Sequence, residues 1–213
     1  MAAGVIYDGF KIDKHVVTKL PSTFERHYIG IDYGTNNPCV FLLIGKHARA
    51  YYVIKEYYYN GKIKGQKSPT DYGADLVKFI GDTKINKTFL DPSALGFKTE
   101  LKKFKIYPKP ADNEVLAGIM KTAAIIAENR LFIHASCKNT LKEFSSYIWD
   151  EKAATRGEDK PLKQNDHAMD ALRYTLFSLE GKGAGLDSFK GSSVETAINS
   201  AASPVSKIRE LLK

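Results

Sequence analysis

Residues 28–34, with the sequence YIGIDYG, are the stretch that decides the fold of this chain. Their first five residues predict a buried strand that ends in the carboxylate of Asp32, and residues 33–38 predict the turn that follows. Apolar runs at residues 40–44 and 51–58 predict two further strands. Because the connections between the three strands are short, we expect an antiparallel meander.

Downstream of the meander, helical and extended patterns alternate. The pair Asn60–Gly61 first predicts a tight turn. Apolar residues at helical spacing and short apolar runs then predict helices at 70–80, 94–103, 113–129, 135–147 and 166–179 and strands at 87–90, 106–107 and 131–133. A meander followed by alternating helices and strands predicts an α/β fold with a mixed central sheet flanked by helices.

Segments of different character divide the chain. Residues 1–27 lack a long period and are interpreted as an entry strand or as the end of a preceding element. Residues 28–180 carry the patterns described above and are predicted to form one domain. From residue 181 the composition shifts to Gly, Ser and Ala, which predicts a flexible tail with one short helix at 204–212.

The composition narrows the class of protein. The chain of 213 residues contains 32 Lys and Arg against 24 Asp and Glu, a net charge of +8. This excess favours a polyanionic partner, because neutralising phosphates releases their counterions. No apolar run approaches the ~18 residues that span a bilayer, and the N-terminus lacks the layout of a secretion signal. With only Cys39 and Cys137, neither a disulfide scaffold nor a thiolate zinc site is supported. We therefore expect a soluble intracellular protein without a membrane partner.

Asp32, Asp91 and Asp170 stand out by their positions. Asp32 and Asp91 each follow an apolar strand, where a carboxylate is costly unless it is paired or binds a metal. Asp170 lies in the middle of the last predicted helix. If the two strands are neighbours and the helix packs across their ends, the carboxylates converge. Such oxygen ligands suit Mg²⁺ or Mn²⁺, and two such ions would support phosphodiester hydrolysis without a covalent nucleophile.

Residues 165–174, NDHAMDALRY, place two more polar residues near Asp170. Helical spacing puts Asp166 and His167 on the same face as Asp170. A histidine there would ligate a metal, orient a water or accept a proton, and Asp166 is predicted to cap the helix N-terminus. Taken singly, each acid is better explained by a turn at a strand end or by a helix surface, but their joint placement favours a metal site.

These stretches together resemble a known family. Residues 28–34, 89–94 (FLDPSA), 113–129, 143–150 (EFSSYIWD) and 165–174 are similar to the C-terminal nuclease domain of the large terminase subunit of tailed bacteriophages, a DNA-packaging motor protein. The resemblance implies an RNase H-like fold. It also implies a metal-dependent endonuclease that cuts concatemeric double-stranded DNA into genome lengths.

The resemblance assigns roles to residues by position. Asp32, Asp91 and Asp170 resemble the metal-binding catalytic acids of the family, and His167 resembles an accessory catalytic residue. The cofactors implied are Mg²⁺ or Mn²⁺, with two ions expected.

Partners and a location follow from the same resemblance. Family members carry an N-terminal ATPase domain and act with a portal protein and a small terminase subunit. Their place is the portal vertex of the procapsid in the host cytoplasm. Residues 1–27 are then predicted to be the remnant that joins the domain to the ATPase. Because the sequence has no G-x-x-x-x-G-K-[ST] loop, we expect no ATP hydrolysis.

Two clusters of basic residues are candidates for contact with a DNA backbone. The cluster in the polar loop before the last helix is the stronger candidate, because that loop leads into the predicted site. Its members are Lys152, Arg156, Lys160 and Lys163. The other cluster follows Asp91, and a solvated face explains it equally well. Its members are Lys98, Lys102, Lys103, Lys105 and Lys109.

Other functions remain open at this point. Residues 30–35, GIDYGT, also suit the phosphate-binding hairpin of actin-like ATPases, although no second phosphate loop or Gly-rich adenosine site accompanies them. A junction resolvase or RNase H-type nuclease would use the same acids. A basic DNA-binding module would need none of them for catalysis, and metal-dependent cleavage that is lost in Asp32→Asn would exclude it.

Overall fold

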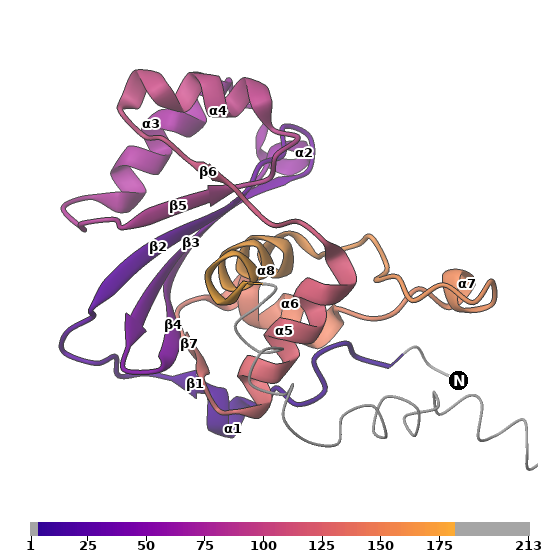
Figure 1. The fold of residues 1–213 in the computed structure, drawn as a ribbon. Coiled ribbons are helices and arrows are strands. Elements are labelled where there is room, and N and C mark those ends of the chain that lie inside the picture. The colour runs from indigo at the N-terminus through magenta and orange to yellow at the C-terminus, as the bar shows by residue number, and fades with distance from the viewer. Residues whose placement is uncertain (1–3, 182–213) are drawn as a thin grey trace, which may run out of the picture. The chain divides into compact units, whose positions relative to one another are not determined.

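The computed structural model describes residues 4–181 of the chain. Of the two units into which the chain divides, the first ends at Leu179 and is compact over its described residues. The first unit is built on a seven-stranded sheet with the strand order β1-β7-β4-β3-β2-β5-β6 (Figure 1). The strands are β1 (Val16–Val17), β2 (Arg26–Asp32), β3 (Pro38–His47), β4 (Ala50–Asn60), β5 (Lys87–Leu90), β6 (Lys109–Pro110) and β7 (Leu131–His134).

The pairing of the strands confirms the predicted mixed sheet. β2, β3 and β4 form the antiparallel meander, in which Asp32 lies opposite Val40. β5 pairs with β2 in parallel, with Leu90 beside Ile31. β6 pairs with β5, β7 pairs with β4, and β1 pairs with β7, all in parallel. Asp32 and Asp91 each follow the last pair between β2 and β5, which is Ile31 and Leu90, so the register brings the two acids to the same edge of the sheet.

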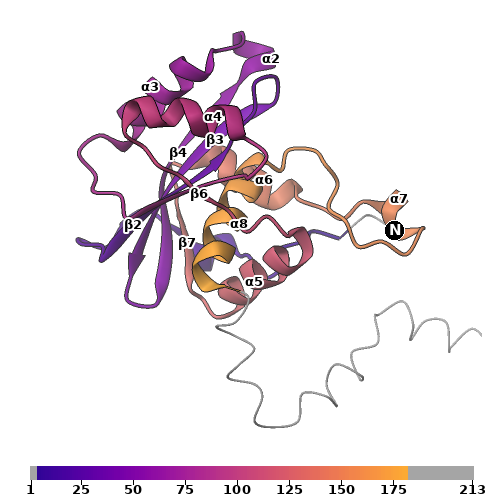
Figure 2. The same cartoon turned by 45° about the horizontal axis from the view of Figure 1, so that its top comes forward.

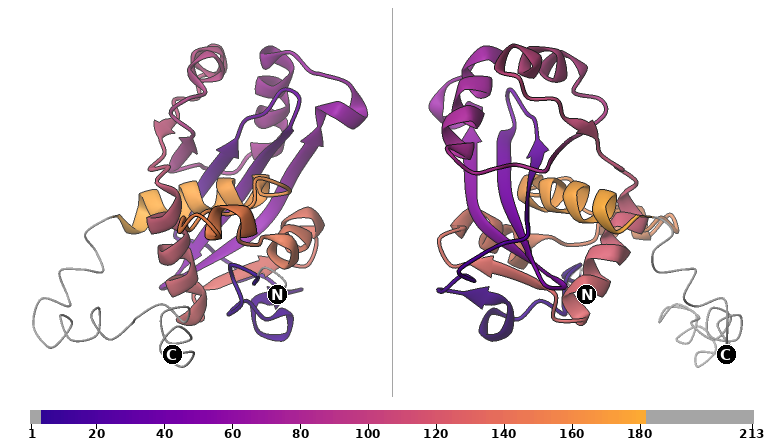
Figure 3. Two further views of the ribbon diagram at one scale, coloured as in Figure 1. Left: turned by 90° about the vertical axis from the view of Figure 1, so that its right-hand side faces the viewer. Right: turned by 60° about the vertical axis from the view of Figure 1, so that its left-hand side comes forward.

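Helices cover both faces of this sheet. Their bounds are α1 (Ile12–His15), α2 (Gly61–Lys64), α3 (Pro69–Ile80), α4 (Leu95–Leu101), α5 (Val115–Ala127), α6 (Lys138–Ser146), α7 (Glu151–Ala154) and α8 (His167–Glu180), with a 3₁₀ turn at Lys102–Phe104. α3 and α4 lie on one face, and α5, α6 and α8 lie on the other (Figure 2 and Figure 3).

Alternate side chains of β2 pack into the two hydrophobic clusters on opposite faces of the sheet. Ile29 and Ile31 are fully buried in the cluster that includes Tyr72 and Leu76 of α3. Tyr28 belongs to the other cluster, which includes the apolar residues of α8. Since successive side chains of a strand point to opposite faces, Gly30 and Asp32 lie on the α8 face together with Tyr28.

Gly30 allows α8 to lie directly against β2. A β-carbon at this position would lie 2.2 Å from Oγ1 of Thr175 and 2.3 Å from the carbonyl oxygen of Ala171. Only a residue without a side chain leaves room for the helix backbone at this distance. The glycine of the YIGID stretch therefore sets how closely the helix that carries His167 and Asp170 approaches the strand that carries Asp32.

The residues before β2 are part of the first unit. Val16 and Val17 form the edge strand β1, which pairs with β7. The ring of Phe10 stacks on that of Phe144 in α6, with 4.0 Å between the ring centroids. β1 and Phe10 therefore pack against β7 and α6 within this unit, and the predicted domain bounds of 28–180 stay a prediction. A role of residues 1–27 in joining a preceding domain stays a prediction.

Three local predictions are wrong. Asn60–Gly61 does not form a tight turn, because the side chain of Asn60 accepts a hydrogen bond from the backbone N–H of Lys62 and caps α2. The strand predicted at 106–107 is replaced by β6 three residues later, at the edge of the sheet, where Pro110 is tolerated. The polar loop predicted before the last helix, at residues 152–165, begins as a helix, because α7 covers its first residues and Asp150 caps the N-terminus of α7.

Two further observations bear on the class of protein. No helix within residues 4–181 is both long and apolar enough to cross a membrane. Cys39 and Cys137 are both buried as free thiols. The predicted flexible tail from residue 181 and the helix at 204–212 lie outside the described residues, apart from Gly181 itself.

Candidate active site

The carboxyl end of β2 borders a hollow of about 470 Å³. The turn between β2 and β3, the end of β4 and the first turn of α8 form its walls. Of the predicted site residues, Asp32, His167 and Asp170 line this hollow, and so does Asp166. The strand and the helix that carry these acids are therefore brought together as the sequence predicts.

Asp32 and His167 are in direct contact. Nδ1 of His167 lies 2.8 Å from Oδ2 of Asp32. An ionised carboxylate can only accept, so Nδ1 donates to Asp32 and carries hydrogen. Both side chains are largely buried, with 16% of Asp32 and 19% of His167 exposed.

This contact changes the protonation of both groups. Burial raises the pKa of Asp32, and the nearby charges of Asp170 and Asp166 raise it further, against the opposing effect of the hydrogen bond from His167. Burial alone would lower the pKa of His167, but the hydrogen bond to Asp32 and the surrounding carboxylates outweigh it and raise the pKa. A hydrogen-bond donor or cation beside Asp32 therefore stabilises the ionised form of this buried carboxylate.

Asp170 is held between two basic side chains. Nη2 of Arg173 lies 2.8 Å from Oδ1 of Asp170, and Nζ of Lys163 lies 3.3 Å from Oδ2. Lys163 also lies 3.2 Å from Oδ2 of Asp166. Asp170 and Arg173 are almost fully buried, while the Lys163 side chain is 65% exposed. Arg173 is thus a buried part of the fold, whereas Lys163 faces solvent at the mouth of the hollow.

Asp91 lies at the same edge of the sheet but does not line the hollow. Its Oδ2 accepts a hydrogen bond of 2.8 Å from the hydroxyl of Tyr174, and its Oδ1 accepts one of 2.7 Å from the backbone N–H of Ser93. Burial alone would raise the pKa of Asp91, but these hydrogen bonds outweigh it and lower the pKa. Asp91 is therefore held as an anion by Tyr174, which lies on α8 one helical turn beyond Asp170.

Tyr174 donates to Asp91 and is influenced by the charges of the other two acids. Burial raises the pKa of its hydroxyl, and the negative charges of Asp170, Asp32 and Asp91 all raise it further. A neutral hydroxyl surrounded by carboxylates acts as a hydrogen-bond donor. Tyr174 follows Asp170 in the motif, but nothing in the local pattern indicates that its hydroxyl reaches Asp91.

The donor set suits a hard divalent cation, although its side chains are not gathered into a preformed cage. Within the described residues, no three His, Cys, Asp or Glu side chains are close enough together to hold a metal ion. Carboxylate oxygens are nevertheless the ligands that Mg²⁺ and Mn²⁺ prefer. The ammonium of Lys163 already lies between Asp166 and Asp170 in the place of a cation. Because no such cluster is preformed among the described residues, side chains would have to move to join Asp32, Asp91 and Asp170 around one ion.

The N-terminus of α8 is capped from another helix. Oε2 of Glu143, in α6, accepts hydrogen bonds from the backbone N–H groups of Ala168 at 2.7 Å and Met169 at 3.3 Å. The prediction that Asp166 provides this cap with its side chain is wrong, because Glu143 takes those N–H groups and the Asp166 carboxylate faces Lys163. The partner of a helix end can be distant in sequence, and local spacing does not reveal it.

The predicted basic residues occupy different surroundings. Lys163 alone of the loop cluster lines the hollow. Arg156 and Lys160 lie 3.7 Å and 3.0 Å from the carboxylate of Glu158, on the loop that projects away from the sheet with α7 (Figure 1). In the other cluster, Lys103 pairs with Glu100 at 2.7 Å. Arg156, Lys160 and Lys103 therefore already pair with carboxylates of the chain.

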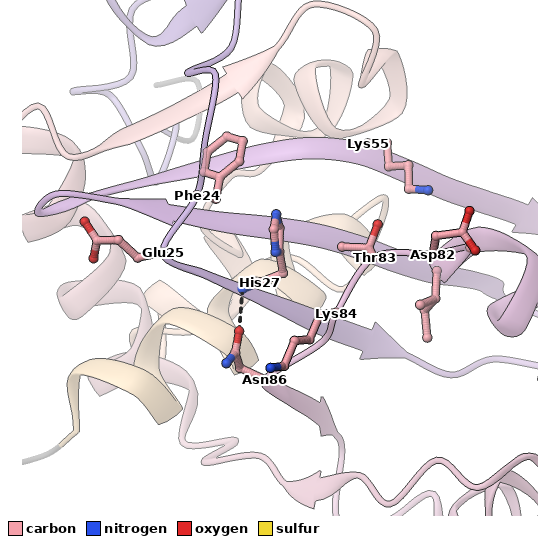
Figure 4. Close-up of a pocket in the computed structure, with 10 residues that line it drawn as sticks. Phe24, Glu25, His27, Lys55, Asp82, Thr83, Lys84 and Asn86 are labelled. Atoms are coloured by element: carbon pink, nitrogen blue, oxygen red, sulfur yellow. Dashed lines mark hydrogen bonds between the residues drawn. The ribbon is translucent and has the colours of Figure 1, made fainter.

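A larger hollow, of about 750 Å³, lies elsewhere and contains none of the predicted site residues. Figure 4 shows residues of its lining, among them Phe24, Glu25 and Lys84, with Asn86 next to His27. The backbone N–H of His27 donates a 2.8 Å hydrogen bond to the side-chain oxygen of Asn86. His27 is near the start of β2, at the opposite end of the strand from Asp32, so this hollow is separate from the acids.

The arrangement matches a family of known proteins. Residues 93–179 match the model of the terminase RNaseH-like domain. The chain contains a terminase RNase H-like domain. The matched residues include His167, Asp170 and Tyr174, whereas Asp32 and Asp91 lie before the match begins.

Relatives of this terminase domain are known both by sequence and by structure. The chain is 29% identical over 190 residues to the large terminase subunit of Escherichia phage T5, which covers 83% of this chain and 42% of the relative. The solved large terminase of a thermophilic bacteriophage has a TM-score of 0.78 and 45% identity, covering 82% of this chain and 45% of that one. The chain thus spans less than half the length of these two relatives.

A more distant structure shares the fold. The large terminase nuclease of another thermophilic phage, G20c, is 16% identical, and it covers 82% of this chain and 98% of that one. It was solved with bound magnesium and with bound cobalt, with TM-scores of 0.58 and 0.55. At this identity, the likeness shows the RNase H-like fold alone.

Proposed function

We propose that this chain is a metal-dependent endonuclease domain that cuts double-stranded DNA during viral genome packaging. The observation that carries the proposal is the contact between Asp32 and His167 beside Asp170, at the edge of the sheet where Asp91 also lies. The net charge of +8 suits a polyanionic substrate. The fold of large terminase nucleases and the metal-bound G20c structures support the same function.

Asp32, Asp91 and Asp170 are proposed to hold two Mg²⁺ or Mn²⁺ ions. The chemistry that such ions supply when bound is the activation of a water and the stabilisation of the leaving oxygen of a phosphodiester. Asp32 and Asp170 present oxygens to the hollow, and Tyr174 holds Asp91 in its ionised form. Residues of this chain thereby keep hard anionic ligands at one edge of the sheet.

His167 and Lys163 have supporting roles in this proposal. His167 orients Asp32 through Nδ1, which fixes the direction of the other oxygen of that carboxylate. Lys163 is proposed to exchange its carboxylate partners for a phosphate of the DNA, because its side chain is exposed at the mouth of the hollow. Lys152, Arg156 and Lys160 are proposed to contact the backbone further along, without reading sequence.

The proposed partners follow from the relatives. The chain is proposed to act beside an ATPase domain in a large terminase and, with a portal protein and a small terminase subunit, at the portal vertex of the procapsid in the host cytoplasm. Within that assembly it would cut concatemeric DNA into genome lengths.

A plasmid cleavage assay tests the activity. Wild-type protein is incubated with supercoiled plasmid and Mg²⁺, Mn²⁺ or EDTA, beside Asp32→Asn and the matched control Asp82→Asn, which changes an exposed acid outside the site. We expect nicking or linearisation with the metals, none with EDTA, none in Asp32→Asn and full activity in Asp82→Asn. Cleavage that persists in Asp32→Asn would remove Asp32 from the mechanism, and absence of cleavage in folded wild type with either metal would contradict the nuclease.

A further inference from the structure

Glu143 is a buried carboxylate to which the proposed chemistry assigns no role. It lies in α6, in the stretch EFSSYIWD, and only 2% of the residue is exposed. Burying a carboxylate is costly unless hydrogen bonds satisfy its oxygens. Here both oxygens are used: Oε2 accepts from the N–H groups of Ala168 and Met169, and Oε1 accepts a 2.7 Å hydrogen bond from the hydroxyl of Tyr58.

These hydrogen bonds join three elements at the edge of the site. Tyr58 is in β4 and itself lines the hollow. Ala168 and Met169 stand between His167 and Asp170 in the first turn of α8. The first N–H groups of a helix have no partners within the helix, so Glu143 satisfies donors that would otherwise be buried without an acceptor. A single carboxylate therefore ties the first turn of α8 to both α6 and β4.

The geometry of α8 depends on this tie. His167 and Asp170 project from the same turn whose backbone Glu143 holds. A small rotation or shift of that turn would change the 2.8 Å contact between His167 and Asp32 and the position of Asp170 in the hollow. The positive end of the helix dipole also favours a negative charge at this place.

We propose that Glu143 is a positioning residue of the nuclease site, which sets the first turn of α8 so that His167 meets Asp32 and Asp170 faces the metals. Tyr58 holds Glu143 in place from the sheet. The inference rests on the proposed function for its kinetic effect, but the placement of His167 is a property of the protein alone.

The kinetic test uses Glu143→Gln, which keeps the size of the side chain and removes its charge. We expect a fall of about 10- to 100-fold in kcat for plasmid cleavage or in the affinity for Mn²⁺, as for other residues that orient metal ligands. The affinity for Mn²⁺ is measured as the concentration that gives half-maximal cleavage. DNA affinity in EDTA should stay within about twofold of wild type, because Glu143 is buried away from DNA. Wild-type kcat and Mn²⁺ dependence in Glu143→Gln would overturn the proposal.

The structure provides a matched control in Glu56. This residue of β4 also caps a helix from outside, since its carboxylate accepts from the backbone N–H groups of Asn139 and Thr140 at 2.8 Å each, at the start of α6. Glu56→Gln therefore removes the same kind of cap away from the acids. We expect a lower Tm with nearly unchanged kcat and Mn²⁺ dependence. An equal loss of activity in Glu56→Gln at an equal loss of Tm would overturn the positioning role, because general destabilisation would then explain both variants.

A readout independent of activity separates this inference from the proposed function. Long-range ¹H–¹⁵N spectra of the histidine rings report whether Nδ1 of His167 donates to a carboxylate. We expect the His167 signals to move in Glu143→Gln and to stay at their wild-type positions in Glu56→Gln. If wild type does not cleave DNA but these signals behave as expected, the nuclease proposal fails and the positioning of His167 stands.

Tyr58→Phe covers the case in which Glu143→Gln does not fold. It removes the donor to Oε1 and leaves the two backbone hydrogen bonds to Oε2 intact. We expect a smaller loss of kcat in the same direction and a smaller movement of the His167 signals. No change in either measurement would contradict the link from Tyr58 through Glu143 to α8.

Discussion

Nδ1 of His167 lies 2.8 Å from Oδ2 of Asp32, although 135 residues separate them along the chain. β2 carries the carboxylate on the face that α8 covers, and the first turn of α8 carries the imidazole. The contact orients Asp32, and together with the nearby carboxylates it outweighs burial and raises the pKa of His167. The contact shows that the end of β2 and the first turn of α8 lie next to each other in the candidate site.

The first prediction concerns the orienting role of His167. His167→Ala should lower the rate of metal-dependent cleavage by about 10- to 100-fold without abolishing it, since the ligands themselves remain. His167→Asn should retain more activity than His167→Ala, because its side-chain amide can donate to Asp32 from a position near that of Nδ1. Initial cleavage rates at saturating Mn²⁺ check this, and complete loss of activity in both variants would make His167 a ligand or a proton carrier.

The second prediction separates two of the acids by stability. Asp170→Ala leaves the guanidinium of Arg173 buried without its carboxylate, which should cost about 3–5 kcal/mol of unfolding free energy. Asp91→Ala removes hydrogen bonds from Tyr174 and Ser93 at a more exposed position, so a smaller loss of about 1–3 kcal/mol is expected. Both variants should lack cleavage activity. Urea unfolding followed by the fluorescence of the single tryptophan measures the difference, and equal losses would argue against the buried ion pair.

The third prediction concerns the close packing of α8 on Gly30. In Gly30→Ala the new methyl group meets the backbone of Ala171 and the hydroxyl of Thr175, neither of which can move freely. Overpacking of this kind costs about 1–3 kcal/mol, and it should push α8 away from Asp32 and reduce cleavage as well. Gly96→Ala in α4 is the control, because no atom lies within 4 Å of its added β-carbon. A Gly30→Ala protein with wild-type stability and activity would show that α8 does not lie so close to β2.

The fourth prediction concerns pH and a carboxylate outside the site. Burial alone would raise the pKa of Asp75, but hydrogen bonds from Lys67 and Tyr57 outweigh it and lower the pKa. A carboxylate with a lowered pKa stabilises the fold at pH values above the ordinary aspartate pKa of about 3.9. This stabilisation is lost as the pH falls through the lowered pKa of the folded state.

Asp75→Asn should therefore be less stable than wild type at pH 7, by about 1–3 kcal/mol, and the difference should shrink in acid. Urea unfolding between neutral and acidic pH checks the sign, with Asp82→Asn as the exposed control. A difference that grows as the pH falls would contradict the lowered pKa.

The final prediction concerns DNA binding. Lys163→Ala should weaken DNA binding in EDTA and lower the slope of log Kd against log salt by about 1, the expected loss for one phosphate contact. Lys152→Ala, on the exposed α7, is the comparison within the same cluster. An unchanged salt slope in Lys163→Ala would leave Lys163 as a partner of the carboxylates only.

Much of the fold was predictable because the relevant patterns are local. The run at residues 28–32 predicted β2, and its period of two places Gly30 and Asp32 on one face. Helical spacing predicted α3, α5 and α8 to within a few residues. The short elements β1 and β6 were not placed correctly, because two residues contain too little pattern and are held by pairing with distant strands.

The candidate site also has a part that local patterns predicted and a part that they did not. Sequence alone singled out Asp32, Asp91, His167 and Asp170, because acids after buried strands and on an apolar helix are unusual and together resemble a nuclease motif. Only the tertiary structure showed what holds each of them: Arg173 on Asp170, Tyr174 on Asp91 and Glu143 on the start of α8. The physical reason is that a strand or helix follows from the order of neighbouring residues, whereas the partner of a buried charge depends on which distant segments the fold places beside it.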